Sequence, residues 1–134
     1  GITVDNCSLY GCGTYGIVFH GCDHSDVKNS EIYECTYGLL DIYESSELSF
    51  ENCTFRDSKD MSMICIQSGN EIEFKKCTFR DNLINPTFNS CFFVNLSEYS
   101  DAAFTDCIFE NNQYNLFSNR KVTQKNCKIN DNTK

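Results

Sequence analysis

The sequence predicts an all-β solenoid of about six coils, with three short strands in each coil. The first observation is a motif that recurs six times. It consists of a mostly apolar residue, any residue, a second apolar residue, two mostly polar residues, Cys or Ser, any residue, and Leu, Ile or Phe. Its anchors are Cys7, Ser30, Cys53, Cys77, Cys107 and Cys127. Successive anchors lie 20 to 30 residues apart, a repeat length typical of solenoid proteins.

The second observation is the period of the apolar residues within each repeat. In 48–55 and 72–79 apolar and polar residues alternate, apart from a two-residue step before each cysteine. A period of two indicates strands, and the step indicates a bend between two short strands. A second apolar cluster follows roughly ten residues later and supplies a third strand. These clusters are 17–19, 39–42, 63–66, 91–94 and 116–117.

The repeat resembles that of the right-handed parallel β-helix of pectate-lyase-like proteins. The family pattern Ile-x-Phe-x-Asn-Cys-x-Phe-x-x-Asn is similar to Phe-Glu-Asn-Cys-Thr-Phe-Arg-Asp-Ser at 50–58 and to Phe-Thr-Asp-Cys-Ile-Phe-Glu-Asn-Asn at 104–112. The resemblance extends over 2–132 and implies a single parallel β-helix domain at 1–134. Because the chain starts and stops in mid-pattern, we expect it to be a segment of a longer protein.

The longest repeat lies between Cys77 and Cys107 and carries an insertion at 85–89. We expect this insertion to form a loop on the side of the coil. The fold implied by the resemblance serves lyases, hydrolases, epimerases, phage fibres and non-catalytic scaffolds, so it leaves the function open.

The chain has ten cysteines, and five of them occupy the anchor position. Residues at one repeat position stack at roughly 4.8 Å per coil, so we expect these thiols to face the interior. Side chains that point the same way are poorly placed for a disulfide. The sequence has no Cys-x-x-Cys pair, so the spacing of the cysteines gives no indication of a zinc site. We therefore expect free thiols, with Ser30 in the same slot. Unpaired thiols favour a cytoplasmic location, whereas a lyase would be extracellular.

A second stack is expected at the bend that follows each motif. Its members are Cys12, Cys35, Ser58, Asn82, Asn112 and Asn132. Amide side chains in successive coils can hydrogen-bond to one another and to the backbone of the bend, which predicts a ladder.

The residue before each ladder position forms a candidate acidic row, which contains Glu34, Asp57, Asp81 and Asp131. Carboxylates in adjacent coils would lie roughly 5 Å apart, so Glu34, Asp57 and Asp81 are candidate calcium ligands. Asp57 and Asp81, with Arg56 and Arg80, are also the candidate catalytic residues, since the arginines can act as base or bind an anionic sugar. The alternative is a solvated face on which the arginines relieve carboxylate repulsion. The polygalacturonase motifs of the resembling family are absent, which argues against that activity. No cofactor is expected, and calcium enters only if the chain is a lyase.

Partners are limited by the net charge of -8, which argues against nucleic acid and against an anionic membrane surface. Tyrosines of the first two repeats suggest a contact face for sugar rings or a protein partner instead. The candidate ligand-binding residues are Tyr10, Tyr33, Tyr37 and Tyr43, of which the first two share a repeat position.

The sequence favours a non-catalytic scaffold or binding module, with a polysaccharide or a protein as the partner. The alternative is a segment of a polysaccharide lyase or glycoside hydrolase that acts on acidic polysaccharides. A third possibility is end-to-end self-association through uncapped coils, because a solenoid exposes strand edges at both ends.

Overall fold

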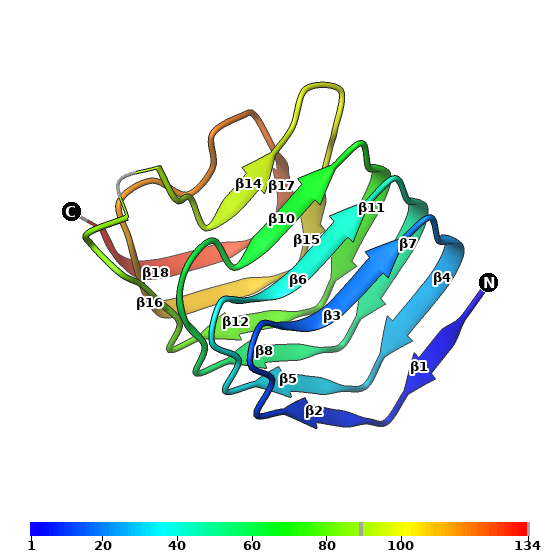
Figure 1. Cartoon of the computed structure of the whole chain (residues 1–134), viewed down its shortest axis with the longest axis horizontal. Helices are drawn as coiled ribbons and strands as arrows, with labels where there is room; N and C mark the ends of the chain where they lie inside the picture. The colour runs from blue at the N-terminus through cyan, green and yellow to red at the C-terminus, as the bar shows by residue number, and fades with distance from the viewer. Residues whose placement is uncertain (89, 134) are drawn as a thin grey trace.

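The computed structural model describes residues 1–88 and 90–133. Over these residues the chain forms 18 β-strands and no helix, wound into a solenoid (Figure 1). No membrane-spanning helix is therefore found in this part of the chain. All strand pairs are parallel, because each coil lays the same strands on those of the coil before it. The all-β solenoid with three strands per coil is confirmed.

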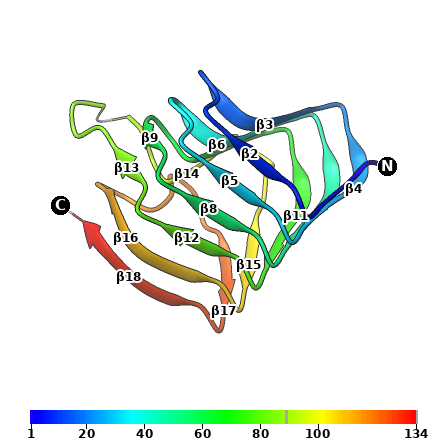
Figure 2. The ribbon, with the colours of Figure 1, turned by 90° about the horizontal axis from the view of Figure 1, so that it is seen from below.

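The strands form three sheets, one for each side of the coil (Figures 1 and 2). The first sheet contains β1 (Thr3–Asp5), β4 (Asp23–Lys28), β7 (Ser46–Glu51), β11 (Asn70–Lys75), β15 (Ala103–Thr105) and β17 (Thr123–Lys125). The second sheet contains β2 (Ser8–Tyr10), β5 (Glu31–Tyr33), β8 (Thr54–Arg56), β9 (Lys59–Asp60), β12 (Thr78–Arg80), β13 (Leu83–Ile84), β16 (Ile108–Tyr114) and β18 (Lys128–Thr133). The third sheet contains β3 (Tyr15–His20), β6 (Gly38–Tyr43), β10 (Ile64–Gln67) and β14 (Val94–Leu96).

Two stacks of phenylalanine fill the interior. One consists of Phe50, Phe74 and Phe104, and the other of Phe55, Phe79 and Phe109. Neighbouring rings in each stack are nearly parallel, with centroids 4.7 to 4.9 Å apart, and all six side chains are fully buried. The rings of one stack meet those of the other edge to face. Both geometries are favourable for aromatic pairs, so the two stacks stabilise the middle coils together with the buried aliphatic side chains around them.

The bends between the first and second sheets have a fixed backbone geometry. The residue before each cysteine anchor has a positive φ of 52 to 55° at Asn6, Asn52, Lys76, Asp106 and Asn126. Asn and Asp tolerate this left-handed conformation better than most residues. The predicted two-residue step is therefore a left-handed bend. Its asparagines also connect coils, because Asn52 Nδ2 donates to Asn29 Oδ1 over 2.8 Å.

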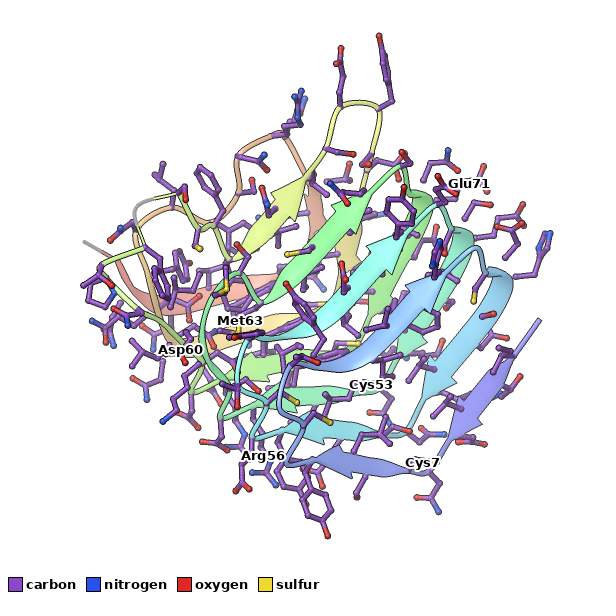
Figure 3. All side chains as sticks on the ribbon, in the orientation of Figure 1. Cys7, Cys53, Arg56, Asp60, Met63 and Glu71 are labelled. Carbon is purple, nitrogen blue, oxygen red and sulfur yellow. The ribbon has the colours of Figure 1, made fainter. Side chains whose placement is uncertain are left out.

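The cysteine anchors behave as expected in the middle coils and differently in the first coil. Cys53, Cys77 and Cys107 are buried, and each thiol lies 3.4 Å from a carbonyl oxygen of the coil before it. Cys7 is exposed, since no earlier coil of this chain covers it (Figure 3). All ten cysteines are free thiols in the structure.

The predicted ladder is present from Ser58 to Asn112. Asn82 Oδ1 accepts a hydrogen bond from the Ser58 backbone N–H over 3.1 Å, and Asn112 Oδ1 accepts one from the Asn82 backbone N–H over 3.1 Å. The Asn82 side-chain amide also donates to Asn112 Oδ1 over 2.9 Å. These bonds satisfy polar groups inside the coil, as the sequence predicts.

The prediction of Asn132 as the last rung of the ladder is wrong, because Asp131 occupies that rung. The register between β16 and β18 shifts between Glu110 and Gln113, which inserts one residue into β16. Asp131 therefore occupies the rung, where Oδ1 accepts the Asn112 backbone N–H over 3.0 Å. Asn132 is exposed and donates to Asn111. A bulge of this kind shifts the pairing of the two strands by one residue. Counting residues along the motif does not reveal the bulge, so the count assigns the rung to the wrong residue.

The insertion in the longest repeat leaves the coil after β13, as predicted, and 85–88 form a turn. Asn85 Oδ1 accepts hydrogen bonds from the backbone N–H and the hydroxyl of Thr87. The remaining residue of the predicted loop, Asn89, lies outside the described residues.

We expect this 134-residue chain to associate end to end in solution. Ile2 and Ile129, in the two outermost coils, are about half exposed, and β1 and β17 are edge strands of the first sheet. Unpaired strand edges beside apolar side chains favour pairing with a further coil. Sedimentation velocity over a hundredfold range of concentration would show larger species as concentration rises, and Ile129→Lys would reduce them. A monomer at every concentration would contradict this prediction.

Candidate functional site

The outer face of the second sheet carries a column of four predicted site residues. Tyr10, Tyr33, Arg56 and Arg80 are register partners on successive strands. The Tyr10 and Tyr33 rings stack with centroids 5.0 Å apart, and the Arg56 guanidinium lies 3.9 Å from the Tyr33 ring centroid. Tyr10 and Tyr33, which share a repeat position in the sequence, are thus stacked in the structure. Because both faces of the Tyr33 ring are covered, a sugar ring can stack only on the outer face of Tyr10.

The two arginines of this column are paired with carboxylates. Arg56 Nε lies 3.0 Å from Glu31 Oε2, and Arg56 Nη1 lies 2.8 Å from Asp57 Oδ2. These hydrogen bonds raise the pKa of Arg56. Arg80 Nη1 lies 2.9 Å from Asp81 Oδ2. Each cation is thus already matched by an anion of the same sheet.

The acidic row is a backbone feature as well as a row of charges. Glu34, Asp57 and Asp81 have positive φ of 54 to 57°, in the bend after the second sheet, and Asp131 has left the row for the ladder. Asn111 and Arg80 donate hydrogen bonds to Asp81 and lower the pKa of that carboxyl. Within 1–88 and 90–133 no group of three or more His, Cys, Asp or Glu side chains is arranged to hold a metal ion. Calcium at this row stays a prediction.

The four predicted tyrosines are not gathered on one surface. Tyr43 ends β6 in the third sheet, and its ring meets His20 edge to face at 4.9 Å. Tyr37 is exposed on the bend before β6, where its backbone N–H donates to Thr14. Tyr10 and Tyr33 therefore belong to one side of the coil and Tyr43 to another.

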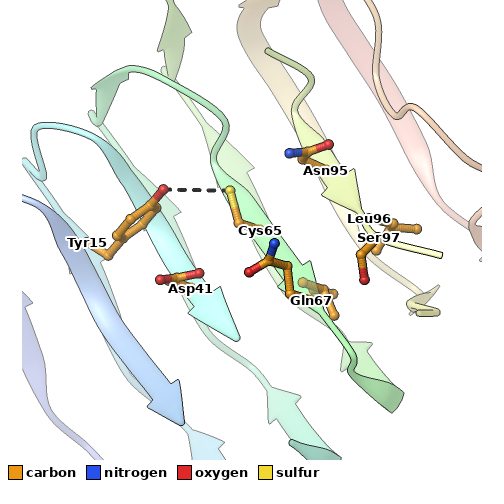
Figure 4. A pocket seen from close by; sticks show the side chains of 8 residues that line it. Tyr15, Asp41, Cys65, Gln67, Asn95, Leu96 and Ser97 are labelled. Carbon is orange, nitrogen blue, oxygen red and sulfur yellow. Dashed lines mark hydrogen bonds between the residues drawn. The ribbon is translucent and has the colours of Figure 1, made fainter. Parts of the chain in front are cut away.

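A groove of about 340 Å³ lies on the outer face of the third sheet (Figure 4). We call it the third-sheet groove, and its polar lining consists of Tyr15, Asp41, Cys65, Gln67, Asn95 and Ser97. Asp41, Cys65 and Asn95 are register partners on β6, β10 and β14, so they form its floor as one column. A volume in this range is ordinary for a small-ligand site.

Tyr15 forms the wall at one end of the third-sheet groove. Its hydroxyl lies 3.6 Å from Cys65 Sγ, two strands away, and either group can donate the hydrogen bond. The ring crosses β6 over Gly38, where an added Cβ would lie 3.0 Å from Tyr15 Cε1 and would collide with the Ser62 carbonyl oxygen. Only glycine at position 38 lets the ring lie this close to the sheet.

The charge in the groove comes from one carboxylate. Asp41 is half-buried, and burial raises its pKa. Burial likewise raises the pKa of the Cys65 thiol, which keeps it protonated and neutral. Gln67 and Asn95 add amide donors and acceptors, and Ser97 adds a hydroxyl. The groove can therefore hydrogen-bond to a ligand rich in hydroxyl groups.

We expect Asp41→Asn to stabilise the protein at neutral pH. A folded-state pKa above the unfolded value means that ionisation of Asp41 opposes folding once the pH rises above about 3.9. At pH 7 the variant should melt at a higher temperature than the parent chain, and below about pH 3 the two should have the same melting temperature. Thermal melts at both pH values measure this. Asp26→Asn, at an exposed position of β4, serves as the control and should leave the melting temperature unchanged at both pH values. A lower melting temperature at pH 7 would contradict the prediction.

The groove residues were missed by the sequence analysis, although a signal was present. Asp41, Cys65 and Asn95 lie 24 and 30 residues apart, the same spacings as the anchors Cys53, Cys77 and Cys107. Polar residues between buried apolar neighbours in these strands indicate an outward-facing column.

A second hollow, of about 510 Å³, lies on the outer face of the first sheet. Its carboxylates are exposed, and most have a partner. Glu47 lies 2.7 Å from His24 Nδ1, Glu73 lies 3.4 Å from Lys75 Nζ, and Asp101 accepts the Glu71 backbone N–H over 2.8 Å. Figure 3 shows Glu71 and Arg56 on different sides of the coil. This hollow has the character of a solvated acidic face.

Comparison with known proteins agrees with the architecture. A search of curated proteins finds no match to this chain. A family model described as a right-handed β-helix region matches residues 1–134. The parallel sheets, the stacked anchors and this match together show that the chain belongs to the right-handed β-helix family.

Proposed function

We propose that this chain is a non-catalytic β-helix module that binds a glycan in the third-sheet groove. The observation that carries the proposal is the column of Asp41, Cys65 and Asn95 on the groove floor, with Gln67 and Ser97 beside it. Three consecutive coils each contribute to this floor, so the groove runs along the axis of the solenoid. A chain of sugar residues laid along that axis would meet polar groups of each of these three coils.

The chemistry of the lining suits sugar hydroxyls. An amide side chain offers two donors and a carbonyl acceptor, which is the pattern that adjacent hydroxyl groups of a sugar require. Tyr15 at one end adds an aromatic surface, and Tyr43 is the register partner of Gln67 on the neighbouring strand. Aromatic rings beside polar groups are the usual composition of sites for amphipathic ligands.

A binding role is favoured over a hydrolytic one by the number of acids. Glycoside hydrolases generally use two carboxyl groups that flank the scissile bond, whereas the groove lining contains one, Asp41. The acids and bases of the lyase alternative are on the second sheet, where Arg56 and Arg80 pair with Asp57 and Asp81. That alternative would require the substrate to bind outside the third-sheet groove.

The test is titration calorimetry with a panel of oligosaccharides of equal length. We expect the double variant Gln67→Ala, Asn95→Ala to weaken binding about tenfold or more, because it removes several hydrogen bonds to the ligand. Asn130→Ala, which removes an exposed amide on the second sheet, is the matched control and should bind as the parent does.

Two results would contradict the proposal. Binding that survives the groove variant but is lost with Tyr10→Ala would move the site to the second sheet. Release of unsaturated or reducing-end products from polyuronides with calcium, abolished by Asp57→Ala or Asp81→Ala, would establish a lyase.

A further inference from the structure

We infer that the third-sheet groove selects a glycan that carries a positively charged amine, such as a chain of glucosamine residues, over neutral and uronic-acid glycans. The inference rests on the proposed glycan-binding function and names the ligand class of the same groove. It follows from the charge inside the groove, the neighbours of that charge, and the placement of the cations of the chain.

Asp41 is the only ionisable carboxylate that lines the groove, and its neighbours on the sheet leave it without a counter-charge. Its register partners are Val18 on β3 and Cys65 on β10. Val18 is apolar and Cys65 is a neutral thiol. Among the described residues, Asp41 takes part in no ion pair. A half-buried carboxylate without a cation is costly, and a ligand that brings an ammonium group removes that cost.

The lining of the groove offers no positive charge to an anionic ligand. The groove lining contains no Lys, Arg or His. Arg56 and Arg80, which the sequence analysis considered as ligands for an anionic sugar, lie on the second sheet and are paired there. A uronate in the third-sheet groove would thus face Asp41 without compensation, and like charges at close range repel.

The acidic hollow of the first sheet is a less suitable place for an amine. Its acids are exposed, and Glu47 and Glu73 are already paired with His24 and Lys75. Exposed charges with existing partners contribute little to a new interaction. Asp41 differs in being half-buried, unpaired and beside amide groups that can hold the sugar ring.

The experiment compares three tetrasaccharides by titration calorimetry: β-1,4-linked glucosamine, its fully N-acetylated form, and oligogalacturonate. The first two share one backbone and differ in the acetyl group, which removes the positive charge on nitrogen. We expect the glucosamine tetramer to bind about tenfold or more tightly than the acetylated form, as a hydrogen bond between charged groups requires. Oligogalacturonate should bind most weakly of the three.

Two variants separate the groove from the general negative charge of the protein. Asp41→Asn should lower the affinity for the glucosamine tetramer to that for the acetylated tetramer. Glu71→Gln removes the same charge from the first sheet and should leave the affinity unchanged. Equal losses in both variants would mean non-specific attraction to a chain of net charge -8 and would overturn the inference.

The outcomes distinguish the inference from the function on which it rests. If the acetylated tetramer or oligogalacturonate binds as tightly as the glucosamine tetramer and the groove variants weaken that binding, the amine preference is wrong and the glycan-binding function stands. If none of the three binds, the glycan-binding function falls, and the amine preference falls with it.

Discussion

Replacing Phe79 with alanine is expected to lower the free energy of unfolding by about 3 to 5 kcal/mol. Phe79 is the middle ring of its stack, with centroids 4.7 Å from Phe55 and 4.9 Å from Phe109. It also meets Phe74 and Phe93 edge to face. Alanine would open a cavity that these neighbours cannot close, because they are held in three different coils.

Urea denaturation followed by fluorescence or circular dichroism measures this loss. Phe88→Ala provides a matched control, since Phe88 lies on the insertion loop and is 38% exposed. We expect the control to change the free energy of unfolding by less than about 0.5 kcal/mol. Similar losses in the two variants would mean that the phenylalanine stacks do not dominate the stability of the solenoid.

The architecture was predictable because it depends on one local property repeated along the chain. The motif fixes which residues face inward, and parallel stacking then places equal positions on top of one another. Phe50 lies on Phe74, and Cys53, Cys77 and Cys107 are buried, as the motif predicts. Such agreement requires no knowledge of contacts between distant residues beyond the repeat itself.

The error at Asn132 has a different origin. The bulge at Glu110–Gln113 brings Asp131, and not Asn132, to the rung beside Asn112. Asp131 is stabilised on the rung because its carboxylate accepts three hydrogen bonds. Two come from the backbone N–H and the side-chain amide of Asn112, and one from the Tyr114 hydroxyl. These hydrogen bonds become visible only with the side chains in place.

The candidate site was less predictable than the fold. The spacing of Asp41, Cys65 and Asn95 could have been found from the anchor spacings, but the spacing does not say which side of the coil is hollow. The hollow depends on Tyr15, whose ring lies across Gly38 of the next coil. The two coils thus meet at a glycine, which interrupts the apolar pattern of the sequence. The charges of the acidic row predict a site. The left-handed backbone at Asp57 and Asp81 is a further reason for Asp at these positions, because Asp tolerates a positive φ better than most residues.

Replacing Asn112 with leucine is expected to lower the free energy of unfolding by about 3 kcal/mol or more, although leucine has a similar size. Asn112 is fully buried at the centre of the ladder. Its Oδ1 accepts from the backbone and side chain of Asn82, and its Nδ2 donates to the Phe79 carbonyl and to Asp131, each over 2.9 to 3.1 Å. Leucine would leave several of these groups buried without a partner, at about 1 to 3 kcal/mol each.

The matched control is Asn82→Ser, because the rung before it is already a serine. Ser58 Oγ accepts the Cys35 backbone N–H over 3.1 Å, so a hydroxyl can fill this position and still satisfy the neighbouring coil. Serine at position 82 would keep the acceptor for Ser58 and lose the two bonds that Asn82 Nδ2 donates to Phe55 and Asn112. We therefore expect a smaller loss than for Asn112→Leu, of about 2 kcal/mol, in the same urea denaturation experiment. If Asn112→Leu proved as stable as the parent, the ladder would contribute nothing beyond filling space, and apolar stacking alone would hold the coils in register.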